Sequence, residues 1–125
     1  MRLLLDTHVF LWAVADSRKL NAAARRLIQE ADEVRVSAAS IWEIAIKAWL
    51  GKLSGDADQL AAAVGDSGFA ELPVTSRHAA MVARLPPHHG DPFDRLLVAQ
   101  ALAEPLILLT ADRTLARYSD LVRVI

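Results

Sequence analysis

The chain has 125 residues, of which 54% are hydrophobic and 23% are charged. This length fits one domain, residues 1–125, and the apolar content is enough for one core, which excludes a disordered protein. The net charge of -1 excludes a uniformly basic nucleic-acid coat. The absence of cysteine excludes disulfides, thiolate zinc sites and cysteine nucleophiles.

No apolar stretch reaches the roughly 18 residues that a membrane span needs. Asp6 interrupts the first apolar run too early for a signal peptide. We therefore expect a cytoplasmic protein that does not enter a membrane.

Short apolar runs alternate with helical segments, a pattern typical of a parallel sheet with crossover helices. In chain order we expect strand 3–5, helix 9–16, helix 22–30, strand 34–37, helix 40–50, helix 56–64, strand 69–72, helix 75–83, loop 85–90, helix 91–103, strand 106–109, short helix 112–118 and strand 122–125. Right-handed crossovers then give a three-layer α/β/α fold around a central parallel sheet of four to five strands.

Acidic residues follow several of the expected strands. Asp6 comes directly after the first strand, Glu43 lies about one helical turn beyond the second, and Asp112 follows the fourth. Asp91 and Asp94 open the helix that leads into the fourth strand. Because ligands of such sheets bind outside the carboxyl ends of the strands, we expect these acids to lie around one crevice.

Each acid also has a purely structural explanation. Ser40 and Glu43 form an S-x-x-E capping box in sequence. Asp91 is a natural N-cap ahead of Pro92, and Asp6 and Asp112 can each cap the helix that follows. Taken singly, these explanations are as good as functional ones, and for Asp91 capping is the better one.

The joint pattern favours a metal site. Carboxylates that converge without a paired cation raise one another's pKa and destabilise the fold. A divalent cation offsets this repulsion, and oxygen-only ligands suit Mg²⁺ or Mn²⁺. Such an ion can neutralise and orient a phosphodiester and activate water. The chemistry indicated is metal-assisted phosphodiester hydrolysis.

Four blocks of the sequence carry a family resemblance: residues 3–8 (LLLDTH), 36–44 (VSAASIWEI), 91–101 (DPFDRLLVAQA) and 108–112 (LLTAD). In these blocks, which span nearly the whole chain in the family's order, the chain resembles PIN-domain ribonucleases, specifically the VapC-type toxins of type II toxin–antitoxin pairs.

The resemblance implies a Mg²⁺- or Mn²⁺-dependent endoribonuclease that leaves 5′-phosphate and 3′-hydroxyl ends. Asp6 and Asp94 would be the principal metal ligands, with Glu43 and Asp112 completing the catalytic and metal-binding set. The implied partners are an RNA substrate and a cognate antitoxin protein. Many relatives carry the fourth acid a few residues beyond the position of Asp112, where this chain has Leu115. Asp91 is therefore an alternative fourth ligand.

Four further residues are candidates for binding substrate. Thr7 and Thr110 can position Asp6 or a water molecule, or simply cap strand ends. Lys47 can hold a phosphate at the pocket rim or form an i,i+4 pair with Glu43. Arg95 follows a candidate acid and is one of the few basic residues that could bind an RNA backbone.

Trp42 and Trp49 lie seven residues apart on a helix that is apolar around most of its circumference. Core packing is the default explanation, and a homodimer surface or an antitoxin groove is the alternative. The adjacent His88 and His89 lie in a Pro-rich loop, where solvent exposure is expected. The alternative to an enzyme is a catalytically silent PIN-like module that docks RNA or a protein partner.

Overall fold

A five-stranded parallel sheet lies at the centre of the computed structural model, which describes residues 1–125. The strands are β1 (Arg2–Leu5), β2 (Glu33–Ser37), β3 (Ala70–Leu72), β4 (Ile107–Thr110) and β5 (Val122–Val124). Their order across the sheet is β3-β2-β1-β4-β5, and every neighbouring pair is parallel. The expected sheet is therefore confirmed with all five strands.

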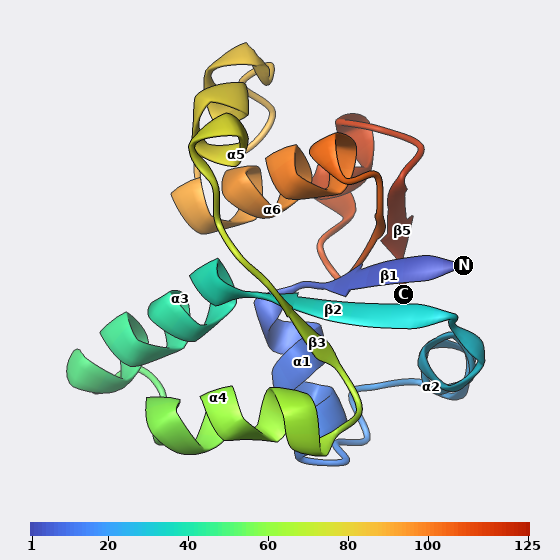
Figure 1. The fold of residues 1–125 in the computed structure, drawn as a ribbon, viewed down its shortest axis with the longest axis vertical. Helices are drawn as coiled ribbons and strands as arrows, with labels where there is room; N and C mark the ends of the chain where they lie inside the picture. Colours follow the sequence, from blue (N-terminus) through green and yellow to red (C-terminus); the bar gives the residue numbers. More distant parts are fainter.

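Helices cover both faces of this sheet. They are α1 (Thr7–Val14), α2 (Ala22–Glu30), α3 (Ala38–Trp49), α4 (Ala57–Asp66), α5 (Ser76–Met81) and α6 (Pro92–Ala103), with the short 3₁₀ helices η1 (Val82–Arg84) and η2 (Arg113–Arg117). In Figure 1, α5 and α6 lie on one side of the sheet, and α1, α2 and α4 lie on the other. The predicted three-layer α/β/α fold is confirmed.

The central strands β1 and β4 are buried on both faces, as is typical of a parallel sheet, while the edge strands β3 and β5 are more exposed. Leu3 and Leu5 pack with Phe10 of α1 in one apolar cluster, on the side of α1, α2 and α4. Leu4 packs with Leu97 of α6 in a second cluster on the opposite side. This alternation follows from the two-residue period of a strand. It fixes β1 in the middle of the core, so the residue that follows it, Asp6, has a rigid support.

Helix α3 begins earlier than the sequence pattern suggests. Its N-cap is Ser37, whose Oγ accepts a hydrogen bond from the Ala39 backbone N–H at 3.0 Å. Ser40 and Glu43 therefore lie inside the helix, and the capping-box interpretation of these two residues is wrong. The earlier start places both side chains in buried positions facing α1 rather than at the helix end.

None of the helices combines the length and the apolar character that crossing a bilayer requires. The tryptophans of α3 are exposed: the exposed fraction is 60% for Trp42 and 87% for Trp49. The prediction that these two residues pack in the core is therefore wrong. Trp42 contacts Phe93 edge to face, with ring centroids 5.2 Å apart, while Trp49 lies at the end of α3.

Candidate active site

A cavity of about 310 Å³ opens at the carboxyl edge of the sheet. All five acids singled out from the sequence line this cavity: Asp6, Glu43, Asp91, Asp94 and Asp112. The other lining residues are His8, Trp12, Lys47 and Ala111. The structure thus brings together carboxylates from four separate segments of the chain. The expected convergence on one crevice is what the fold produces.

Asp6 is held rigidly at the floor of the cavity. It is the N-cap of α1, and its Oδ1 accepts the Val9 backbone N–H at 2.8 Å. Its Oδ2 accepts a hydrogen bond from the hydroxyl of Thr110, at the end of β4. Burial raises the pKa of Asp6 above its usual range despite these two donors. Asp6 therefore caps α1 and lines the cavity at the same time, and the hydrogen bond from Thr110 orients its carboxylate.

Glu43 projects from α3 and is 3% exposed. The Thr7 hydroxyl donates to Glu43 Oε1 at 2.7 Å, and the Ser40 hydroxyl lies 2.9 Å from Thr7 Oγ1. On the other oxygen, Lys47 Nζ donates to Oε2 at 2.6 Å. This hydrogen bond, together with the attraction of Glu43, raises the pKa of Lys47. Thr7 thus orients a carboxylate, and the i,i+4 pair of Lys47 is formed at the cavity wall.

Asp91 and Asp94 both enter the cavity from the start of α6. Asp91 is the N-cap, and its Oδ1 accepts the backbone N–H groups of Phe93 at 2.8 Å and Asp94 at 3.1 Å. The Asp94 carboxylate accepts no hydrogen bond, unlike those of the other four acids. Burial and the nearby carboxylates of Asp91 and Asp6 raise the pKa of Asp94 to about 7.

Asp112 lies at the more exposed rim and caps η2. Its Oδ1 accepts the Thr114 backbone N–H at 2.9 Å, and its backbone N–H donates to Thr110 Oγ1 at 3.0 Å. Burial acts to raise the pKa of Asp112, but the hydrogen bonds from Thr114 and His89 outweigh it and lower the pKa. The expected position of Asp112 beside the other acids is observed.

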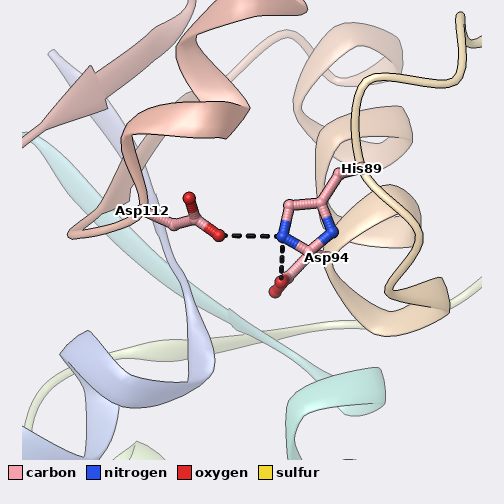
Figure 2. Close-up of side chains that lie close together, drawn as sticks. All are labelled: His89, Asp94 and Asp112. Atoms are coloured by element: carbon pink, nitrogen blue, oxygen red, sulfur yellow. Dashed lines mark hydrogen bonds and ion pairs between the residues drawn. The ribbon is translucent and has the colours of Figure 1, made fainter.

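His89 is the residue of this site that the sequence did not reveal. Its Nε2 lies 2.8 Å from Asp112 Oδ2 and 3.5 Å from Asp94 Oδ2, so the ring lies between two acids from different segments (Figure 2). The expectation of solvent exposure was wrong for His89, which is only partly exposed. Sequence offered one signal, a histidine two positions before Asp91, but it could not tell which of two adjacent histidines faces inward.

Arg95 points away from the cavity. Its guanidinium donates to the carbonyl oxygens of Pro86 and Val82, both at 3.0 Å, and to the Tyr118 hydroxyl at 3.1 Å. These contacts tie α6 to the loop before it, because a guanidinium offers several donors in a fixed plane. An RNA contact of Arg95 stays a prediction, and no contact in the structure supports it.

The family model of the PIN domain matches residues 3–121. This chain belongs to the PIN domain family. Among curated proteins, Ribonuclease VapC22 of Mycobacterium tuberculosis is 36% identical to this PIN domain in an alignment that covers 90% of this chain and 88% of that protein.

Solved structures share the fold of this PIN domain at low sequence identity. A chain of VapBC2 from Rickettsia felis, solved with a DNA fragment from its promoter, has a TM-score of 0.72 and 15% identity, and the match covers 100% of this chain and 99% of that one. A chain of DNA-bound VapBC from Salmonella typhimurium has a TM-score of 0.69 and 14% identity, with 100% and 97% covered. At these identities the likeness establishes the fold.

The donor set of this PIN domain suits a hard divalent cation. All five converging acids offer oxygen, which is the ligand atom that Mg²⁺ and Mn²⁺ prefer. Most of their oxygens already accept one protein donor and keep a second lone pair, while the Asp94 carboxylate accepts none. Burial and the neighbouring carboxylates raise the pKa of Asp94, and Lys47 is the one lysine or arginine that lines the cavity. The residues therefore fit the cation that the sequence predicted.

Proposed function

We propose that this PIN domain is a Mg²⁺- or Mn²⁺-dependent endoribonuclease that acts as the toxin of a type II toxin–antitoxin pair. One observation carries the proposal: five carboxylates line one cavity, and burial together with the neighbouring carboxylates of Asp91 and Asp6 raises the pKa of Asp94 to about 7. Groups with such shifts cluster at functional sites. The name of the VapC22 relative, a ribonuclease, supports RNA as the substrate. Such a protein would act in the cytoplasm.

We assign the metal-binding and catalytic roles to Asp6, Glu43, Asp94 and Asp112. Asp6 and Asp94 are the principal ligands, as the family resemblance implies; both line the cavity, and burial raises the pKa of each. Asp91 is already bound as an N-cap and is the reserve ligand. When bound, the ion would neutralise the phosphodiester and lower the pKa of water near it.

Other residues of the cavity orient the carboxylates and bind the substrate. Thr110 and Thr7 fix the orientation of the Asp6 and Glu43 carboxylates. Lys47 lies in the cavity wall, where its ammonium would bind a phosphate oxygen of the substrate. The cavity floor is buried, so charge interactions there are stronger than in water. Phosphate contacts of this kind carry no sequence preference.

The proposed partners are a cognate antitoxin and a second copy of this chain. Structural neighbours include a toxin–antitoxin complex from Klebsiella pneumoniae, with a TM-score of 0.68, 18% identity, and 98% and 96% of the two chains covered. The exposed Trp42 and Trp49 on α3 supply an apolar surface of the kind that anchors interfaces. We assign this surface to the homodimer.

Cleavage of RNA by purified protein tests the proposal. We expect cleavage in Mg²⁺ or Mn²⁺, none in EDTA, and a loss of at least a hundredfold in Asp94→Asn. Mn²⁺ should raise the melting temperature of the wild type but not of Asp6→Asn, because a ligand that binds only the folded state stabilises it. Asp120→Asn, which changes an exposed acid outside the cavity, is the matched control.

The silent-module alternative makes the opposite forecast. Growth arrest that survives Asp94→Asn unchanged would overturn the catalytic function and favour a module that acts by binding. If Mn²⁺ does not change the melting temperature of the wild type, the cavity does not bind the metal, and the acids serve as helix caps.

A further inference from the structure

The loop before α6 is fastened from two sides. The His89 backbone N–H donates to the Tyr118 hydroxyl at 2.9 Å. Arg95 donates to the same hydroxyl at 3.1 Å and to the loop carbonyl of Pro86 at 3.0 Å. His88 packs edge to face on the Tyr118 ring, with centroids 5.1 Å apart. The position of His89 is therefore set by the fold and not by contacts with the acids alone.

The ring of His89 has one tautomer that fits its surroundings. The Asp91 backbone N–H can only donate, and it lies 3.0 Å from His89 Nδ1. Nδ1 must therefore accept, which places the ring hydrogen on Nε2. The Nε2–H then points at Asp112 Oδ2, 2.8 Å away, with Asp94 Oδ2 at 3.5 Å (Figure 2).

This tautomer argues against His89 as a metal ligand, although one atom each of His89, Asp94 and Asp112 lie within 4.8 Å of one another. Coordination needs a free lone pair on Nε2. With Nδ1 accepting the Asp91 N–H, a lone pair on Nε2 would leave neither ring nitrogen protonated. The ring is thus arranged to donate a hydrogen bond to a ligand and not to serve as one.

We propose that His89 is a positioning residue that holds the Asp112 carboxylate beside Asp94 through its Nε2–H. The inference rests on the proposed metal-dependent function. Asp112 follows β4 and Asp94 belongs to α6, so no covalent or helical geometry fixes the distance between these mutually repelling groups. The loop histidine supplies that link. Donors behind metal-binding carboxylates are worth roughly 10–100-fold in metal affinity.

Calorimetric titration of the full chain with Mn²⁺ tests the assignment. His89→Phe keeps the ring but loses the donor, and we expect at least tenfold weaker Mn²⁺ binding. His89→Gln keeps an N–H at nearly the same reach, and we expect affinity within about threefold of the wild type. His88→Phe is the matched control, because it preserves the packing on Tyr118 and no acid contacts His88.

The outcomes separate the two proposals. A wild type that does not bind Mn²⁺ overturns the proposed function and this inference with it. Wild-type binding that is undiminished in His89→Phe overturns the inference only. An equal loss in His89→Gln and His89→Phe also overturns it, because the imidazole itself would then be required.

Nitrogen NMR of the wild-type ring keeps the inference testable if His89→Phe does not fold. We expect the hydrogen on Nε2 both without and with saturating Mg²⁺. A hydrogen on Nδ1, or its transfer to Nδ1 on adding Mg²⁺, would make His89 a ligand and overturn the inference.

Discussion

Hydrogen bonding distinguishes the carboxylates of the cavity from one another. Asp6, Glu43 and Asp112 each accept at least two donors, so their orientation is fixed before any ligand arrives. Asp94 accepts none, and burial together with Asp91 and Asp6 raises its pKa to about 7. The cavity therefore holds three acids whose carboxylates are already oriented by hydrogen bonds, and one acid, Asp94, whose charge state depends on whether a cation is bound.

Replacement of Asp94 by Asn should stabilise the metal-free protein only at the higher pH. The raised pKa of Asp94 contributes stability that is present below roughly pH 4 and is lost as the pH rises through about 7. Asn removes the buried charge, so at about pH 8 we expect a gain of about 1–2 kcal/mol, because partial exposure screens the charge. Urea unfolding in EDTA at about pH 4 and about pH 8 measures it.

Asp120→Asn, an exposed control, should show no such pH dependence. Equal stability of the wild type and Asp94→Asn at the higher pH would mean that Asp94 is not strained by its neighbours.

Lys47 places a positive charge in the cavity where we propose that a metal ion binds. Its removal in Lys47→Met leaves the buried Glu43 carboxylate without its partner, so we expect a loss of about 1–2 kcal/mol in EDTA. Because one positive charge is gone, Mn²⁺ should raise the melting temperature by more than in the wild type. Thermal unfolding with EDTA and with Mn²⁺ measures both effects, and Lys52→Met, an exposed lysine outside the cavity, is the control.

A smaller Mn²⁺ shift in Lys47→Met than in the wild type would contradict this account. It would mean that Lys47 organises Glu43 for the ion instead of competing with it.

At the scale of elements, helix N-termini build the site. Asp6 caps α1, Asp91 caps α6 and Asp112 caps η2, so three of the five acids bind backbone N–H groups and face the cavity at once. The partial positive charge of a helix N-terminus offsets part of the repulsion between them, by roughly 0.3–1 kcal/mol each. Capping a helix and lining the cavity are therefore joint roles of these acids.

The segment between η1 and α6 depends on Arg95. Arg95→Lys keeps the charge but cannot reach all of the carbonyl oxygens and the Tyr118 hydroxyl that the guanidinium contacts. We expect a loss of about 1–3 kcal/mol, because half-buried acceptors lose their donors. Urea unfolding measures the loss, and faster hydrogen exchange at the His89 backbone N–H locates it.

Arg113→Lys, which changes an exposed arginine without such contacts, should stay close to the wild type. If hydrogen exchange at the His89 backbone N–H is unchanged in Arg95→Lys, the loop does not depend on Arg95 for its stability.

The periodicity of apolar residues and the signals for helix and strand ends were enough to predict all five strands and all six α-helices, though not the separate 3₁₀ helix η1. Burial of β1 and β4 on both faces produces clear apolar runs in the sequence. The end signals misplaced the start of α3, because Ser37 and Ser40 are both acceptable caps and only tertiary packing decides between them. The acids were predictable from strand ends. His89 was not, because its role depends on how a loop without periodicity folds over η2.

The molecule has two surfaces of different chemistry, an acidic cavity and an apolar surface on α3. The carboxyl edge of the sheet carries the acidic cavity, whereas α3 extends beyond the sheet (Figure 1). The last residue of α3, Trp49, is exposed. The sequence could not assign the tryptophans, since a helix that is apolar all round looks the same whether a core or a partner covers it. Exposed apolar side chains of this size are typical of surfaces that bind a partner.

Trp49→Glu should therefore change the assembly and leave the site intact. We expect the wild type to have twice the chain mass in solution and the variant to be a monomer, because a charge in an apolar interface is left without a partner. Light scattering coupled to size exclusion measures the mass, and Val74→Glu, an exposed apolar position outside α3, is the matched control. Trp49 does not line the acidic cavity, so the rise in melting temperature with Mn²⁺ should persist in the variant. A monomeric wild type would instead leave the α3 surface to the antitoxin.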